Sequence, residues 1–89
     1  MATGWRKIGY GRGSQAEGRG YSKEFGEVEG EKHWAATIER RQGFLESTIW
    51  VLKVWNADRY AISTYPTLAA AKEDAMPLIY TARRGWHGR

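Results

Sequence analysis

Three groups of residues in this sequence could do chemistry: two histidines, a cluster of glutamates, and several arginines that stand among glycines. His33 and His87 lie far apart, and neither belongs to an H-E-x-x-H motif or stands beside a nucleophile elbow. The chain has no phosphate-cradling G-x-x-x-x-G-K-[ST] motif. The glycines from Gly9 to Gly20 do not make a dinucleotide fingerprint, because the sequence predicts neither a strand before them nor a helix after them. We therefore predict a non-catalytic protein without a cofactor.

Four glutamates stand close together within residues 24–31, namely Glu24, Glu27, Glu29 and Glu31. Carboxylates can bind a hard cation such as calcium. The charge pattern favours instead a solvated acidic segment, or one that neutralises the basic N-terminus, so we predict no metal site. The chain contains no cysteine, which excludes disulfides and thiolate metal sites and fits a reducing cytoplasm.

Basic residues gather at the two ends of the chain. Residues 1–23 carry five positive charges and one negative, residues 83–89 carry three positive charges, and residues 32–82 are nearly neutral. Basic ends attract phosphates or acidic protein surfaces, although so small an excess also serves solubility alone. The candidate nucleic-acid contacts are Arg6, Lys7, Arg12, Arg19, Arg40, Arg41, Arg83 and Arg84.

Several of these basic residues have alternative roles. Arg12 and Arg19 stand between glycines near aromatic residues, where cations can meet phosphates while rings stack on bases, but the same segment could also be a tail lying on the domain surface. The pair Arg40–Arg41 could protect an edge strand from aggregation. The pair Arg83–Arg84 falls near a helix C-terminus, where positive charge is favoured.

Five tryptophans in 89 residues indicate a protein that binds a partner. Trp50 stands at an even position and Trp55 at an odd position of one predicted strand, so their side chains point to opposite faces of the sheet. They therefore cannot both face a single core. One of them needs a second cover, which could be the N-terminal segment, the partner subunit of a homodimer or a ligand. The candidate aromatic contacts are Tyr10, Tyr21, Trp50, Trp55 and Trp86.

The elements that must position these residues begin after a glycine-rich segment. Residues 1–31 hold eight of the eleven glycines, which predicts loop or irregular strand. Alternating residues predict a strand over 33–42, and runs of β-branched and aromatic residues predict strands over 48–55 and 59–65, joined by a turn at 56–58. The strand over 48–55 is apolar on both faces, so it should be central or covered on both sides.

A helix is predicted after the third strand. Pro66 ends that strand, Thr67 is a suitable N-cap, and the residues that follow are strong helix formers. One apolar face contains Leu68, Ala71, Ala75 and Leu78. Pro77 predicts a kink or a break, because it removes a helical hydrogen bond and disfavours helical geometry in the residue before it.

The predicted fold class is α+β, a three-stranded antiparallel sheet with one C-terminal helix packed on it. The predicted organisation is a Gly-rich N-terminal segment at 1–31, a domain at 32–82 and a basic tail at 83–89. No apolar run approaches the ~20 residues that a membrane span needs, so we expect a cytoplasmic protein without a membrane partner.

Residues 33–76 resemble a small DNA-binding module. Trp34-Ala-Ala-Thr-Ile-Glu-Arg40 is similar to the first sheet segment of the arm-binding domain of tyrosine integrases and of plant ethylene-response-factor domains, and residues 60–72 are similar to their last strand and helix. The resemblance implies a three-stranded sheet that lies in the DNA major groove, although the dense arginine pattern of those families is missing here. The strand-to-helix junction is also similar to small bacteriophage accessory proteins, which often inhibit a host enzyme.

Two functions are therefore expected. The first is a small phage-like accessory protein that binds DNA or RNA through its basic ends and an aromatic-bearing sheet. The second is an inhibitor or regulator of a host enzyme that acts through exposed aromatic residues. A nucleic-acid binder should present a contiguous positive face and bind with a steep salt dependence, whereas a protein-binding inhibitor should present an apolar patch with a mixed-charge rim.

Overall fold

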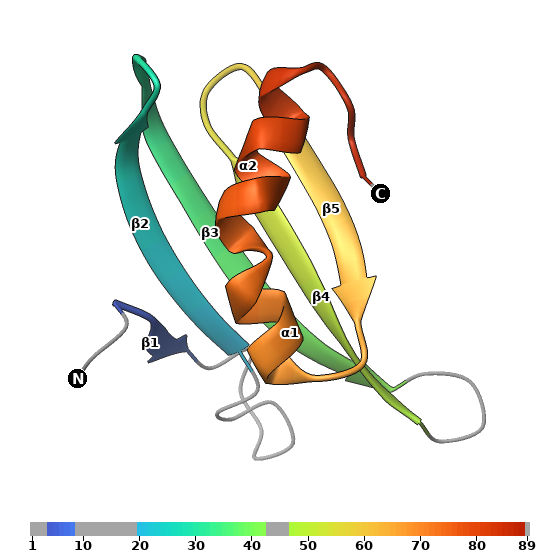
Figure 1. The fold of residues 1–89 in the computed structure, drawn as a ribbon. Helices are drawn as coiled ribbons and strands as arrows, with labels where there is room; N and C mark the ends of the chain where they lie inside the picture. Colours follow the sequence, from blue (N-terminus) through green and yellow to red (C-terminus); the bar gives the residue numbers. More distant parts are fainter. Residues whose placement is uncertain (1–3, 9–19, 43–46, 89) are drawn as a thin grey trace.

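The structure is a computed structural model that describes residues 4–8, 20–42 and 47–88. These residues form a five-stranded antiparallel sheet in the order β1-β2-β3-β4-β5, with two helices packed on one face (Figure 1). The elements are β1 Arg6–Ile8, β2 Gly20–Val28, β3 Glu31–Gln42, β4 Thr48–Trp55, β5 Tyr60–Tyr65, α1 Leu68–Glu73 and α2 Ala75–Arg83. The predicted α+β class is confirmed, but the prediction of three strands and one helix is wrong.

The two additional strands come from the glycine-rich segment that was predicted to be loop or irregular strand. β2 pairs with β3 along its length, and the short β1 pairs with the first residues of β2. The register shifts on both sides of Gly26, which indicates a bulge in the strand. Gly26 has φ 70°, a conformation that glycine adopts easily because it has no Cβ. A turn at Glu29 and Gly30, with φ 52° and 86°, then leads into β3.

The hairpin predicted over residues 48–65 is confirmed as β4 and β5. Its turn is held by the Asn56 side chain, whose Oδ1 accepts hydrogen bonds from the backbone N–H groups of Asp58 and Arg59, each at 2.8 Å. β4 also pairs with β3, so it is an interior strand, as its two apolar faces predicted.

The predicted helix starts where expected and is broken near Pro77. The Thr67 hydroxyl accepts a hydrogen bond from the Ala70 N–H at 3.1 Å and caps α1. The chain then leaves helical geometry at Asp74, and Leu78 N–H donates to Asp74 O at 2.8 Å to begin the bonding of α2. Pro77 therefore lies in the first turn of α2. The N–H groups of a first turn have no partner within the helix, so the missing N–H of proline costs no helical hydrogen bond there.

The core lies between the helices and one face of the sheet. Its largest fully buried side chains are Trp34, Ile38, Leu52, Leu78, Ile79 and Val54. Five buried alanines, Ala36, Ala61, Ala71, Ala75 and Ala82, lie among them and allow the helices to approach the strands closely. This arrangement leaves the other face of the sheet without a covering layer in the part of the chain that the structure describes (Figure 1).

Candidate nucleic-acid interface

The register of the sheet decides which side chains reach that uncovered face. Residues directly opposite each other in antiparallel strands place their side chains on the same face. Ile38 and Leu52 are such a pair, and both are buried beneath the helices. Thr37 and Lys53 form the neighbouring pair and must point the other way. We call the side that carries Thr37 and Lys53 the open face.

Aromatic rings are lined up on the open face. Trp55 and Tyr60 are directly opposite each other in β4 and β5, and Tyr60 is 43% exposed. The chain after α2 adds a third ring, because His87 stacks on Tyr60 with 4.4 Å between the ring centroids and 16° between the planes. The Lys53 ammonium lies 5.6 Å from the Trp55 ring centroid. Exposed ring faces beside a cation suit the stacking of nucleic-acid bases.

A polar row crosses the sheet next to these rings. The register places five residues side by side, one from each strand: Arg6, Ser22, Thr37, Lys53 and Ile62. Arg6 and Lys53 are exposed, and neither forms an ion pair with a described residue. The row therefore offers two cations and two hydroxyl groups, all of which can donate to phosphate oxygens.

The rest of the open face is apolar or of mixed charge. Glu39 accepts from Arg41 at 2.9 Å, so that carboxylate is paired. Ile49 and Val51 are partly exposed beside it, and Ile62 is 40% exposed. The open face thus combines an apolar strip with charges of both signs.

The predicted basic residues do not gather in one cluster. Arg40 and Arg41 point to opposite faces, as expected. They pair with β4 but lie beyond Gly20 and Glu39, the outermost described pair of β2 and β3, so among the described residues β3 is unpaired on that side and their interpretation as edge protection stays a prediction. Lys7 lies on the helix side of the sheet, opposite Tyr21, while Arg84 is exposed at the end of α2. The predicted contacts Arg12, Arg19 and Tyr10 lie outside the described residues.

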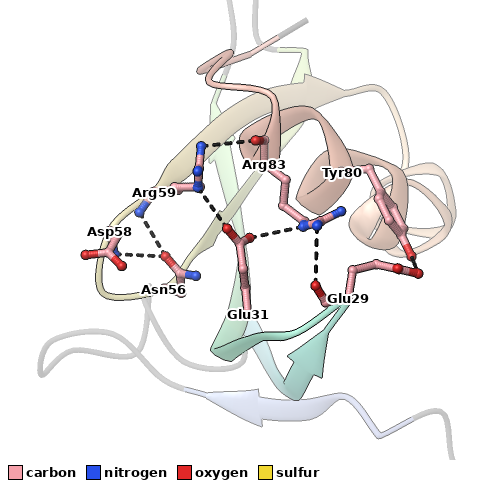
Figure 2. A network of polar contacts seen from close by, with 7 residues as sticks. All are labelled: Glu29, Glu31, Asn56, Asp58, Arg59, Tyr80 and Arg83. Atoms are coloured by element: carbon pink, nitrogen blue, oxygen red, sulfur yellow. Dashed lines mark hydrogen bonds and ion pairs between the residues drawn. The ribbon is translucent and has the colours of Figure 1, made fainter.

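Arg83 is engaged in a polar network rather than free for a phosphate (Figure 2). The Glu31 carboxylate accepts from Arg83 Nε at 3.0 Å and from Arg59 Nε at 3.1 Å. Arg59 also donates to the Arg83 carbonyl at 3.0 Å, and the Tyr80 hydroxyl donates to Glu29 Oε2 at 3.2 Å. The network joins the β2–β3 turn, the β4–β5 turn and the end of α2, so it gives Glu29 and Glu31 a structural role.

We expect Glu31→Gln to lower the free energy of unfolding by about 1–2 kcal/mol, because one carboxylate holds two guanidinium groups. The Glu31 side chain is 30% exposed, which keeps the cost well below that of a fully buried pair. Urea denaturation at low and high salt would measure it, and the loss should shrink in high salt. Glu39→Gln, in the more exposed pair with Arg41, is the control; an equal loss there would contradict a network role for Glu31.

The predicted aromatic contacts have different positions. Trp50 packs against the core, so it is not the surface contact that was expected. Trp55 lies on the open face, so the two tryptophans point to opposite sides of β4, as their spacing required. Tyr21 is partly buried on the helix side, and Trp86 is 67% exposed after α2. Sequence reasoning missed Tyr60 and Lys53, which the pairing across the predicted hairpin could have placed beside Trp55.

No protein family model matches the chain, and neither a curated protein nor a solved structure is significantly similar to it. Within residues 4–8, 20–42 and 47–88, no helix has the length and apolar character required to cross a membrane. The described residues also contain no group of histidine, aspartate or glutamate side chains that could hold a metal ion.

Proposed function

We propose that this protein binds single-stranded nucleic acid on the open face of its sheet. The observation that carries this proposal is the pairing of Trp55 with Tyr60, one row from the cations Arg6 and Lys53. Unpaired bases expose their π-faces and stack on aromatic side chains, while basic groups follow the phosphates. The protein would act as a non-catalytic accessory factor for DNA or RNA.

The width of the sheet favours a single strand over a duplex. Neighbouring strands lie about 4.8 Å apart, so five strands span roughly 19 Å. The major groove of B-DNA is about 12 Å wide and admits a two-stranded ribbon. A broad face with a row of rings is better suited to an unstacked strand lying across it.

The test is to replace the rings one at a time and measure oligonucleotide affinity by fluorescence anisotropy. Base stacking on an aromatic side chain contributes about 1–3 kcal/mol, so we expect Trp55→Ala and Tyr60→Ala each to weaken binding by roughly 5- to 150-fold. Tyr60→Phe keeps the ring and should retain most of the affinity. Loss of binding in Tyr60→Phe equal to that in Tyr60→Ala would show that the hydroxyl, not the ring, is recognised.

A regulator that binds a host protein is the second candidate. The apolar strip of Ile49, Val51 and Ile62, with the Glu39–Arg41 pair at its rim, is the feature that favours it. If the wild-type protein bound neither DNA nor RNA oligonucleotides at low salt, and Trp55→Ala abolished capture of one specific protein, this second function would replace the first.

A further inference from the structure

A second cationic surface lies on the helix side of the sheet, where β1 and β2 extend beyond the helices (Figure 1). The main contacts of α1 and α2 are with β3, β4 and β5, so β1 and the part of β2 that pairs with it lie mostly beside the helices, although Tyr21 packs against the core from there. Three lysines and three aromatic residues meet there. We name this surface the lysine shelf: Lys7, Lys23, Lys72, Trp5, Tyr21 and Phe25.

Two lysines of the shelf lie over its aromatic rings, and the third is paired with one of the aromatic residues in the sheet. The Lys72 ammonium, from α1, is 4.8 Å from the Tyr21 ring centroid. Lys7 is directly opposite Tyr21 in the register of β1 and β2. Lys23 lies two residues further along β2, with its ammonium 4.8 Å from the Phe25 centroid and 5.9 Å from that of Trp5. Tyr21 thus has Lys72 over its ring and Lys7 directly opposite it in the sheet, while Lys23 lies over the neighbouring rings of Phe25 and Trp5.

The shelf has an unbalanced positive charge. None of its three ammonium groups forms an ion pair with a carboxylate among the described residues. The aromatic rings offset only part of the repulsion between neighbouring cations. A ligand with several negative charges would neutralise these groups, and the partly exposed rings beside them suit a nucleic-acid strand better than a single small anion.

The shelf and the open face meet at β1, beside which no further strand lies among the described residues. Arg6 and Lys7 are consecutive residues of β1, so their side chains point to opposite faces of the sheet. Arg6 is at one end of the polar row on the open face, and Lys7 is at the start of the shelf. The distance across the sheet from β4 to β1 is three strand spacings, or about 14 Å.

We infer that the lysine shelf is a second phosphate-binding site for the strand bound on the open face. The strand passes around the edge of β1, from the Trp55 and Tyr60 rings to the ammonium groups of Lys7 and Lys72. This inference rests on the proposed function and extends it, because it makes the binding site longer than the open face.

Oligonucleotides of two lengths can test the path. A single OB-fold domain, which also binds single strands on a small sheet, covers about 4–16 nucleotides. By that scale an oligonucleotide of about 4 nucleotides would occupy the open face alone and one of about 16 would also reach the shelf. Lys7→Gln combined with Lys72→Gln removes two charges from the shelf. Lys32→Gln combined with Arg84→Gln removes two charges from exposed positions outside it and serves as the matched control. Lys23 is left unchanged because its stem passes close to Gly4 and packs near the Trp5 and Phe25 rings.

The shelf pair should affect only the long oligonucleotide. Each phosphate contact on a single strand contributes about −0.7 to the slope of log affinity against log salt, so losing two contacts should make the slope less steep by about 1.4. The short oligonucleotide should bind as it does to the wild type, and the control pair should leave both slopes nearly unchanged. Equal melting temperatures would show that all variants are folded.

Three results would overturn the inference. Equal weakening by the shelf pair and the control pair would indicate a general charge effect. If the shelf pair changed nothing while Trp55→Ala weakened both lengths, the proposed function would stand and the shelf would not be part of it. If oligonucleotides failed to bind but poly-glutamate bound in a manner that required Lys7 and Lys72, the shelf would be a site for an acidic protein segment and the proposed function would fail as well.

Discussion

Trp34→Ala is expected to destabilise the fold more than any other single truncation to alanine. Trp34 is the largest fully buried side chain, only 1% exposed, and its indole lies under the helices opposite the bulge at Gly26. Truncation of a buried aromatic side chain to alanine costs about 3–5 kcal/mol, because the cavity does not close completely. Small domains are stable by only about 5–15 kcal/mol, so the thermal midpoint should fall by at least about 12 °C.

Trp34→Phe separates the ring from its polar atom. The Nε1 of Trp34 is buried and has no hydrogen-bond partner among the described residues. An unpaired buried donor costs about 1–3 kcal/mol, and phenylalanine removes that donor while it keeps an aromatic ring in the core. We expect Trp34→Phe to be more stable than Trp34→Ala by at least about 2 kcal/mol in urea denaturation. Equal losses would mean that the full indole shape, or a hydrogen bond made through Nε1, is required.

Leu78→Ala should have the next largest effect, a loss of about 2–5 kcal/mol. Leu78 is fully buried in α2, in the turn that follows the break at Asp74, and it faces the sheet. Its truncation would weaken the contact of α2 with β4 and β5, so both helices should become less protected in hydrogen exchange.

Two other residues of the helices provide the comparison for Leu78. Leu68 was also predicted to pack the helix on the sheet, but it is only partly buried at the start of α1, so Leu68→Ala should cost less than Leu78→Ala. Met76 is 39% exposed on α2, and Met76→Ala should stay within about 0.5 kcal/mol of the wild type. If the three thermal midpoints did not follow the order of burial, the helices would be docked differently on the sheet.

The residues replaced in the binding variants are separate from the largest side chains of the core. The largest buried side chains lie between the helices and the sheet, whereas Trp55 and Tyr60 lie on the open face and Lys7 is exposed beside the helices. Surface substitutions away from buried contacts usually change stability by less than about 0.5 kcal/mol. Binding variants on either surface should therefore remain folded, which allows affinity to be compared directly.

Local sequence patterns were sufficient for the part of the fold in which neighbouring residues interact with each other. The turn at Asn56 depends on a side chain that bonds to the backbone two and three residues later, and the Thr67 cap depends on a bond to Ala70. The helix break follows from Pro77, which cannot donate a backbone hydrogen bond. These features were predicted because their causes lie within a few residues in the chain.

Pairing between distant segments was decided only by the tertiary structure. β2 contains Gly20 and Gly26 and has no clear alternation, so its strand conformation depends on hydrogen bonds to β3 and on the bulge at Gly26. The availability of Arg83 could not be inferred either, because Glu31 lies 52 positions away in the chain and reaches it only when the β2–β3 turn meets α2.

The candidate binding surfaces show the same division. Composition indicated that basic and aromatic residues would contact a partner, and parity showed that Trp50 and Trp55 must point to opposite sides of one strand. Which of the two lies outside the core depends on the face to which the helices dock, because Trp50 is on the helix side and packs against the core, whereas Trp55 is on the open face. The lysine shelf likewise exists only because the sheet brings Lys7 opposite Tyr21 and α1 brings Lys72 over the same ring. Residue type is a local property, whereas the exposure and grouping of side chains follow from long-range packing.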